Sequence, residues 1–310
     1  MASQFTRTIF ILAVTALLVG LGPRTAYACA CGCGVFDVGT ASLFASGAGG
    51  TVYVEDNFMN QRQNWHGAAD APSTANPDRK IRTNFMTLGG QYMFNRSWGV
   101  MAQLPVWQRH YATVSSGVLN RFDHTALGDI RVMGVYSGFS GDMSTGIIFG
   151  SKLPTGDTAF KGFDADTQIG TGSTDLLLGL YHQGGLDEDA NWIWYGQLMS
   201  DTPLLHRPGY EPGAEVDAAL GAYYNSWYVG SESKLAPLFQ VLASVRMSDH
   251  GNLADPANSG YRRLLLAPGL EFDTGRFRIY GDIELPIYQD VRGYQLIAPE
   301  QFKLVVSYAL

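Results

Sequence analysis

The sequence has no hydrophobic run long enough for a transmembrane helix, only three cysteines and no excess of basic residues. Its longest apolar stretch covers residues 9–21, and no later stretch approaches the roughly 18 apolar residues that a membrane-spanning helix needs. All three cysteines fall between residues 29 and 33, so the long remainder is not a disulfide-stapled secreted domain. The formal net charge of −7 argues against a nucleic-acid partner. The body of the chain must therefore be built without membrane helices or disulfides.

The first 28 residues have the pattern of a secretory signal peptide. Arg7 precedes the apolar run, and Ala26 and Ala28 form an A-x-A cleavage site. Cleavage after Ala28 would place the first cysteine at the new N-terminus. We therefore expect three parts: a signal peptide (1–28), a cysteine-rich periplasmic segment that plugs the body or trails from it (29–48), and the body itself (49–310).

The body alternates between apolar and polar residues with a period of two, which is the period of a β-strand. In "RFRIYGDIELPIYQD", Phe277 and Ile279 fall on one face, whereas Arg278, Asp282 and Tyr288 fall on the other. Most such segments run for about 12 to 16 residues, which exceeds an ordinary globular strand and suits a tilted strand that crosses a membrane. We count twelve segments, at 50–62, 81–95, 98–112, 126–139, 143–154, 172–184, 190–202, 214–228, 234–248, 260–273, 276–290 and 299–310.

The connections between these segments alternate between long and short along the whole chain. Long connections such as "NWHGAADAPSTANPDRK" and "TGDTAFKGFDADTQIG" are separated by short ones such as "NRS", "SGD" and "TG". Outer-membrane barrels have short periplasmic turns and longer extracellular loops, whereas a soluble secreted β-sandwich, the alternative from periodicity alone, has no reason to alternate strictly. The sequence therefore predicts an all-β fold, a 12-stranded antiparallel transmembrane outer-membrane β-barrel. An even strand number places both termini in the periplasm.

The strand ends carry two further marks of such a barrel. The final "FKLVVSYAL" resembles the C-terminal signal that the barrel-assembly machinery reads, although it ends on Leu310 instead of the commoner Phe. We expect that machinery to insert the barrel and outer-membrane lipid to surround it. Aromatic residues that would form an interfacial girdle lie near the predicted periplasmic strand ends: Tyr92, Phe94, Trp98, Trp192, Trp194, Tyr224, Trp227 and Tyr228.

Most charges within the strands fall on the face opposite the apolar one, which would line the barrel interior. Two interpretations remain open: an ion-paired interior that fills a narrow barrel, or a lumen whose charges select solutes, and both can hold in different layers. The predicted lumen charges are Arg109, Asp129, Arg131, Lys152, Asp175, Glu215, Asp217, Arg246, Arg263, Glu271, Arg278, Asp282, Glu284 and Lys303.

Three short motifs resemble those of a known family. They are "ALGDIRV" at 126–132, "KLPTGD" at 152–157 and "QIGTGSTD" at 168–175. Over roughly residues 85–310 the chain resembles the family of outer-membrane proteins associated with phenol meta-pathway degradation. The resemblance implies a transporter-like barrel that passes small, often aromatic or hydrophobic, solutes. Read physically, the proline of the second motif ends a strand and the glycines turn the chain.

Five of the six histidines fall in or beside the predicted outer loops, and acidic residues accompany them in "FDH", "SDH" and "FDAD". Imidazoles and carboxylates at one mouth could bind borderline divalent metals, whereas polar loops contain histidine for no special reason. Both interpretations remain open for His66, His110, His124, His206 and His250.

The cysteines form a compact Cys-x-Cys-x-Cys motif at Cys29, Cys31 and Cys33. Thiolates favour Cu(I), Zn(II) or iron–sulfur clusters, and the intervening glycines leave the backbone free to wrap around an ion. An oxidising compartment also allows two of the three to pair as a disulfide, and a cysteine directly after the cleavage site allows lipidation of Cys29. Metal binding, thiol redox chemistry and lipidation remain open.

Catalytic motifs are absent from the sequence, and we do not expect an enzyme. Ser248 and His250 share a strand face, but no H-E-x-x-H helix, phosphate-binding loop or G-x-S-x-G elbow occurs. The sequence favours an outer-membrane channel for passive passage of small solutes. The alternative is a metal-handling or thiol-redox protein of the envelope that the barrel anchors.

Overall fold

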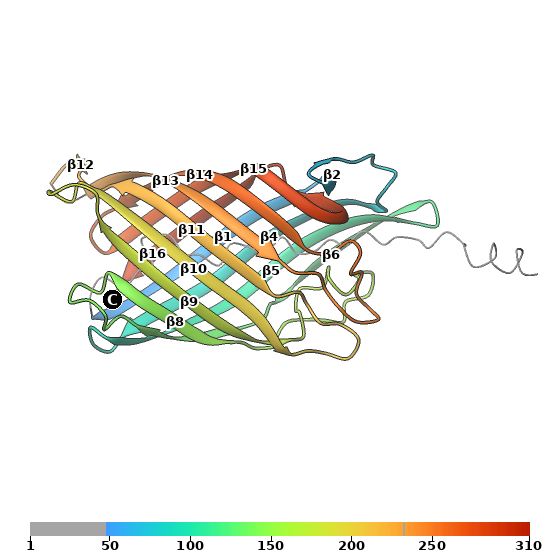
Figure 1. Cartoon of the computed structure of the whole chain (residues 1–310), viewed down its shortest axis with the longest axis horizontal. Coiled ribbons are helices and arrows are strands. Elements are labelled where there is room, and N and C mark those ends of the chain that lie inside the picture. Colours follow the sequence, from blue (N-terminus) through green and yellow to red (C-terminus); the bar gives the residue numbers. More distant parts are fainter. Residues whose placement is uncertain (1–47, 232) are drawn as a thin grey trace, which may run out of the picture.

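Twelve of the strands close into a single antiparallel barrel, as the periodicity predicts (Figure 1). The protein is described here as a computed structural model over residues 48–231 and 233–310. Within that part of the chain, no helix has the length and hydrophobicity needed to cross a bilayer. The barrel strands are β1 (Gly49–Gln61), β4 (Asp78–Met93), β5 (Trp98–Ser115), β7 (Arg131–Tyr136), β8 (Thr145–Lys152), β9 (Thr174–Gly185), β10 (Trp192–Leu205), β11 (Glu215–Tyr224), β13 (Ser233–Arg246), β14 (Tyr261–Asp273), β15 (Phe277–Ile297) and β16 (Gln301–Ala309).

The first and last barrel strands close the ring. β16 pairs with β1 from Thr51↔Ala309 to Met59↔Gln301, and every other barrel strand pairs with its neighbours in the sequence. Because a closed sheet has no free edge, every strand can pair its backbone N–H and C=O groups on both sides, which hydrocarbon requires. Many outward residues are exposed and apolar, as with Val52, Val54 and Leu304.

Long and short connections lie at opposite ends of the barrel. Residues 94–97 and 274–276 make tight turns at one end, the short-turn end. Residues 62–77, 116–130, 153–173 and 247–260 connect strands at the other, the long-loop end. The aromatic residues predicted for the girdle lie at the short-turn end, where Tyr92 contacts Phe94 and Trp192 contacts Tyr224.

Four further strands lie outside the twelve of the barrel. The long-loop end carries β2 (Gln63–Gly67), β3 (Ala69–Asp70) and β6 (Val118–Leu127). β12 (Tyr228–Val229) lies at the short-turn end.

The structure corrects two expectations about strands at the long-loop end. Residues 118–127, most of which we expected in a loop, form β6, because β5 continues beyond the barrel and pairs with it from Val106↔Leu127 to Ser115↔Val118. β15 also continues past its predicted end and pairs with β2. Tyr288, predicted to face inward, is exposed, because a register shift between Leu264 and Leu265 reverses the alternation of β15.

The barrel interior has two layers of different character. In the half toward the short turns, large apolar side chains form one cluster that includes Tyr53, Met93, Tyr181, Tyr195 and Tyr280. In the half toward the long loops, the inward side chains are mostly charged or polar. The sequence analysis did not anticipate the apolar layer, because it considered only an ion-paired interior and a lumen whose charges select solutes.

Candidate functional site

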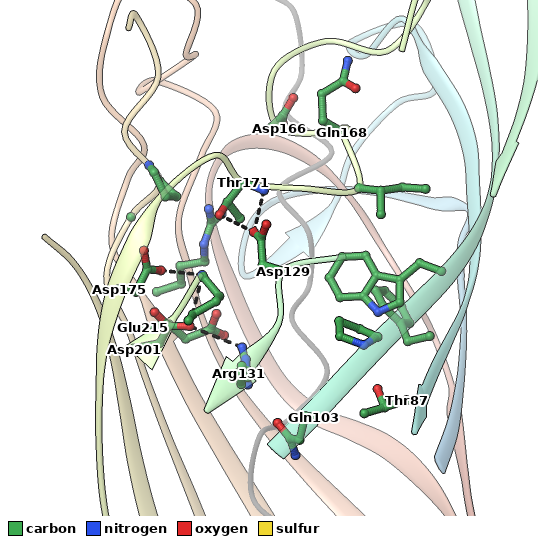
Figure 2. A pocket seen from close by; sticks show the side chains of 18 of the residues that line it. Thr87, Gln103, Asp129, Arg131, Asp166, Gln168, Thr171, Asp175, Asp201 and Glu215 are labelled. Atoms are coloured by element: carbon green, nitrogen blue, oxygen red, sulfur yellow. Dashed lines mark hydrogen bonds and ion pairs between the residues drawn. The ribbon is translucent and has the colours of Figure 1, made fainter. Parts of the chain in front are cut away.

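A cavity of about 160 Å³ lies inside the barrel in its long-loop half (Figure 2). Strands β1, β4, β5, β7, β8, β9, β10, β11 and β13 supply lining residues, and residues 153–173, which we call the roof loop, cover the cavity from the long-loop end. Gln103 and Glu55 lie at its floor, where the Gln103 amide donates a hydrogen bond to the Tyr53 hydroxyl at 2.9 Å. The apolar cluster of the short-turn half begins at that tyrosine.

One wall of the cavity is an ion-paired cluster. The Lys152 ammonium contacts the carboxylate of Asp175 and lies 3.2 Å from Asp201 Oδ2. Arg131 Nη2 lies 3.3 Å from the same Asp201 oxygen. Figure 2 shows Arg131, Asp175 and Asp201 together with Glu215 on this side of the cavity. Two cations and two carboxylates so close together largely neutralise one another, and this explains how the barrel tolerates them in its interior.

The opposite wall is aromatic. Phe85 and Trp107 meet edge to face, with ring centroids 4.8 Å apart, and Pro105 lies beside them along the cavity. The Arg109 guanidinium lies over both rings, 6.0 Å from the Phe85 centroid and 5.8 Å from the Trp107 centroid. The cavity therefore offers an aromatic surface on one side and fixed charges on the other, an arrangement that suits a small molecule with an aromatic ring and a polar group.

The roof loop is held in place by Asp129. One carboxylate oxygen accepts a hydrogen bond from the Gly156 backbone N–H at 2.9 Å. The other accepts from the Thr171 N–H at 2.8 Å and from its hydroxyl at 2.6 Å. Gly156 and Gly170 cross so closely that a Cβ on Gly156 would lie 2.5 Å from the Gly170 Cα. The three sequence motifs that carry the family resemblance thus meet at one point, which fastens the two ends of the roof loop.

Two arginines bind the middle of the roof loop. Arg109 donates from Nη1 to the carbonyl oxygens of Thr167 and Gln168, the latter at 3.1 Å, and from Nε to the Thr83 hydroxyl at 3.0 Å. Arg207 donates to the carbonyls of Thr158 at 2.7 Å and Ala165 at 2.9 Å. Since these bonds join charged donors to backbone acceptors, they hold the loop in one conformation over the cavity.

A cluster of aromatic side chains at the long-loop end packs against the same loop. The His124 ring, on β6, stacks on Phe160 with centroids 4.0 Å apart, and its Nε2 lies 2.8 Å from Asp157 Oδ2. The Ala159 backbone N–H donates to Asp157 at 2.9 Å, and this bond together with His124 lowers the pKa of the Asp157 carboxyl below its usual value. Asp166, deeper in the loop, has its pKa raised by burial and by the nearby Asp164.

Seven of the fourteen predicted lumen charges line the cavity: Arg109, Asp129, Arg131, Lys152, Asp175, Glu215 and Arg246. Asp129 does so from the segment between β6 and β7, not from a strand as expected. Arg246 is engaged by Asp249 at 2.6 Å, and Glu215 accepts hydrogen bonds from Ser244 at 2.9 Å and from Tyr261 at 2.5 Å.

The other seven predicted lumen charges lie elsewhere in the interior or near its short-turn end. Lys303 lies 3.7 Å from Glu284, and Gln240 donates to Asp282 at 2.9 Å. Arg263 lies over the Tyr261 ring at 4.6 Å. Arg278 pairs with Asp273 at 3.0 Å. Asp217 is buried and Glu271 is half-buried.

Several residues of the site were not singled out from the sequence. Asp201 faces inward from β10 and bridges Arg131 and Lys152. It could have been predicted to face inward, because it is an even number of residues from the inward-facing Tyr195, Gln197 and Met199. Glu55, on β1, could have been found in the same way. Asp166 and Gln168 enter the cavity from the roof loop, and no local pattern marks a loop residue as inward-facing.

The structure does not bring the five histidines together. His66 packs on Tyr294, His110 contacts Asp123, and His124 lies with Asp157 and Phe160. His206 lies 3.6 Å from Glu211, and His250 contacts the same glutamate through the backbone. Across residues 48–231 and 233–310, no three His, Cys, Asp or Glu side chains are placed to bind a metal ion. Cys29, Cys31 and Cys33 lie outside the described residues.

Comparison with known proteins supports the fold. The chain matches no protein-family model and no curated protein sequence. It resembles the crystal structure of an outer-membrane channel from Pseudomonas putida F1, with a TM-score of 0.63 and 13% identity over 88% of this chain and 100% of that one. It also resembles the β domain of the Bordetella autotransporter BrkA, with a TM-score of 0.50 and 11% identity over 85% and 100%. At these identities the likeness shows the fold alone, that of outer-membrane β-barrels.

Proposed function

We propose that this chain is an outer-membrane channel that lets small solutes cross the membrane passively, and that the cavity under the roof loop is where a solute binds on the way. The single observation that carries the proposal is a cavity inside a closed barrel, with an aromatic wall opposite an ion-paired wall. A dry engineered cavity of about 150 Å³ holds one benzene molecule, so a volume of about 160 Å³ matches a single small ring.

Small aromatic or hydrophobic solutes are the class that this cavity suits best. Phe85 and Trp107 offer two ring faces, while Gln103 and the charged wall can hydrogen-bond a polar substituent. The same class follows from the resemblance to the phenol meta-pathway family. Passage toward the short turns requires the apolar cluster around Tyr53 and Met93 to rearrange, which suits slow, selective passage and not an open pore. No step of this function involves bond chemistry, so no catalytic residue is proposed.

The proposed topology places the barrel in the outer membrane with the long loops outside and both termini in the periplasm. Residues 1–28 would be removed on export, residues 29–48 would remain in the periplasm, and residues 49–310 would be inserted into outer-membrane lipid by the barrel-assembly machinery. Labelling of single cysteines introduced at the exposed Gly117, on the β5–β6 hairpin, and Gly141, in a turn at the other end, tests the orientation in intact cells. Labelling at 141 but not 117 would reverse it.

Uptake into proteoliposomes tests the channel. Trp107→Ala removes one ring from the cavity wall, and we expect uptake of a small aromatic solute to fall roughly two- to tenfold, the usual worth of an aromatic contact. Trp192→Ala, in the exposed girdle, is the matched control and leaves uptake unchanged. Equal uptake by protein-free vesicles and vesicles with the wild-type protein would refute the channel.

A second function rests on the cysteines alone. Three thiols within five residues suit Cu(I) or another soft ion, or thiol redox chemistry, in a segment that the barrel would anchor. Metal analysis of protein refolded with and without residues 29–34 tests it. Stoichiometric metal in the intact form alone supports metal handling, and equal, near-zero metal in both forms opposes it.

A further inference from the structure

The outward face of β1, β4, β5 and β6 carries a cluster of basic residues near the long-loop end. Lys80 and Arg82 lie on β4, Arg121 lies on β6, and Arg62 directly follows β1. Their inward neighbours Ile81, Thr83 and Tyr111 are buried in the barrel, so strand alternation directs the basic residues outward. These four strands lie side by side in the blue to green part of the barrel (Figure 1). We call this set the rim basic patch.

The strand register brings the members of the patch close together. Arg82 pairs with His110, which pairs with Asp123, and one step further out Lys80 pairs with Ala112, which pairs with Arg121. Neighbouring strands lie about 4.8 Å apart, so Lys80 and Arg121 are separated by roughly 10 Å across the sheet. Side chains as long as lysine and arginine can converge over that distance on one multiply charged group.

Three of the four cations have no partner to neutralise them. Arg62 forms an ion pair with Glu300 at 2.8 Å, and the nearby Asp123 is engaged by His110. Lys80, Arg82 and Arg121, by contrast, form neither an ion pair nor a side-chain hydrogen bond with any residue of 48–231 or 233–310. Arg262, on the outward face of β14, stands alone as a basic residue among its cross-strand neighbours, with Asp290 of β15 as its partner in the register. A net cationic cluster on a chain with charge −7 runs against the overall composition.

The height of the patch coincides with the expected edge of the membrane. Tyr92 marks the girdle at the short-turn end of β4, and Leu88 and Met86 follow as exposed apolar residues on the same face. From Tyr92 to Arg82 the strand rises by roughly 26 Å along the membrane normal, taking about 3.4 Å per residue and a tilt of about 40°. The apolar band of an outer-membrane barrel is about 25 Å tall. Arg82 therefore lies at the outer interface, and Lys80 and Arg121 lie just beyond it.

We propose that the rim basic patch binds the phosphate groups of a phosphorylated lipid headgroup in the outer leaflet. Lysine and arginine bind phosphate through charge-assisted hydrogen bonds, and long basic side chains at an interface reach the headgroup layer while their stems cover apolar surface. This inference rests on the membrane orientation given above, with the long loops outside. It assigns a lipid site to the outer wall, separate from the solute cavity inside.

Binding of a bis-phosphorylated glucosamine lipid to the purified protein in neutral detergent tests the proposal. The wild-type chain is compared with the triple variant Lys80→Gln, Arg82→Gln and Arg121→Gln. The expected result is that the triple variant binds at least about tenfold more weakly, since each basic residue at a membrane surface contributes appreciably to anionic lipid binding. The matched control Arg262→Gln keeps wild-type affinity, and Arg82→Lys with Arg121→Lys retains most of it. Equal affinity of the wild-type chain and the triple variant would overturn the proposal.

Two further arms separate the sources of phosphate and the two functions. The dephosphorylated lipid should bind the wild-type chain at least tenfold more weakly; equal binding of both lipids overturns the site. Inorganic phosphate at the same phosphate concentration should not displace the lipid, and full displacement would assign the site to free phosphate instead. Heat-dependent gel mobility verifies that the triple variant is folded. Solute uptake by the same preparations reports on the channel, so lost lipid binding with normal uptake separates failure of one proposal from failure of the other.

Discussion

Asp129 shows how one carboxylate can organise a site made from distant parts of the chain. Its two carboxylate oxygens accept hydrogen bonds from the backbone N–H groups of Gly156 and Thr171, 27 and 42 residues further along, at the two ends of the roof loop. Sequence analysis placed Asp129 inside the barrel, but it could not find these partners, because hydrogen bonds over such separations leave no periodic signal. The glycines of the motifs were interpreted as turn residues, whereas Gly156 and Gly170 are small because two backbone segments cross there.

Gly156→Ala should loosen the roof loop. The added Cβ would lie 2.5 Å from the Gly170 Cα and 3.0 Å from an Asp129 oxygen, so the crossing segments must separate. We expect faster proteolytic cleavage within residues 153–173, with the barrel itself intact by gel mobility. Gly141→Ala is the control, since no atom lies within 4 Å of its Cβ position. Identical cleavage rates for the two variants would contradict this account of the loop.

Asp157 makes the roof loop sensitive to acid. Because its pKa is lowered in the folded chain, its ionised form stabilises the loop above the ordinary value of 3.8, and that contribution is lost as the pH falls below it. The protease sensitivity of the loop should therefore rise between pH 5 and pH 3 by more in the wild-type chain than in Asp157→Asn, which has already lost the charge. Parallel pH profiles for the two proteins would argue against this role.

At the scale of elements, the barrel strands could be predicted well because alternation is a local property. Each strand has one face in lipid and one in the interior, as the exposed Phe302 and Leu304 and the buried Lys303 illustrate. β6 was missed because it extends past the membrane, where its outward Asp123 and inward His124 are both polar. The end of β15 was missed because the register shift near Leu264 reverses which residues of β15 face inward. Such a bulge depends on how two strands pair, and the composition of one strand does not reveal it.

The Lys152 cluster couples β8, β9 and β10, and its charges depend on one another. Lys152→Met leaves Asp175 and Asp201 buried side by side without their shared cation. Loss of one partner from a buried ionic group costs about 3–5 kcal/mol, so the free energy of unfolding in detergent should fall by about that amount. Urea titration measures it. The double variant with Asp175→Asn should recover part of the loss, and a double variant no more stable than Lys152→Met would mean that the charges are independent.

For the whole molecule, the closed barrel and its two-layered interior predict distinct physical properties. The folded protein should resist SDS at room temperature and migrate differently on a gel after boiling, because closure leaves no unpaired strand edge.

In planar bilayers the ion conductance of the protein should be small compared with that of open 16-stranded porins, since Tyr53, Met93 and Tyr195 fill the short-turn half. A large, steady conductance of the wild-type chain would show that this half opens. The lumen charges predicted from the sequence indicated a polar interior. The packed side chains of the structure show that this polar part ends at the apolar cluster of the short-turn half.

The pairing of β1 with β16 also imposes an order of events in time. β1, the first barrel strand to be synthesised, finds one of its two barrel partners only in β16, Gln301–Ala309. Until that stretch has been synthesised and delivered, β1 has an unsatisfied side, and the sheet can neither seal nor shield its backbone from lipid. Contacts between the extremes of a chain form slowly. Assembly therefore waits for β16, and a chain that lacks residues 301–310 should stall as an open sheet.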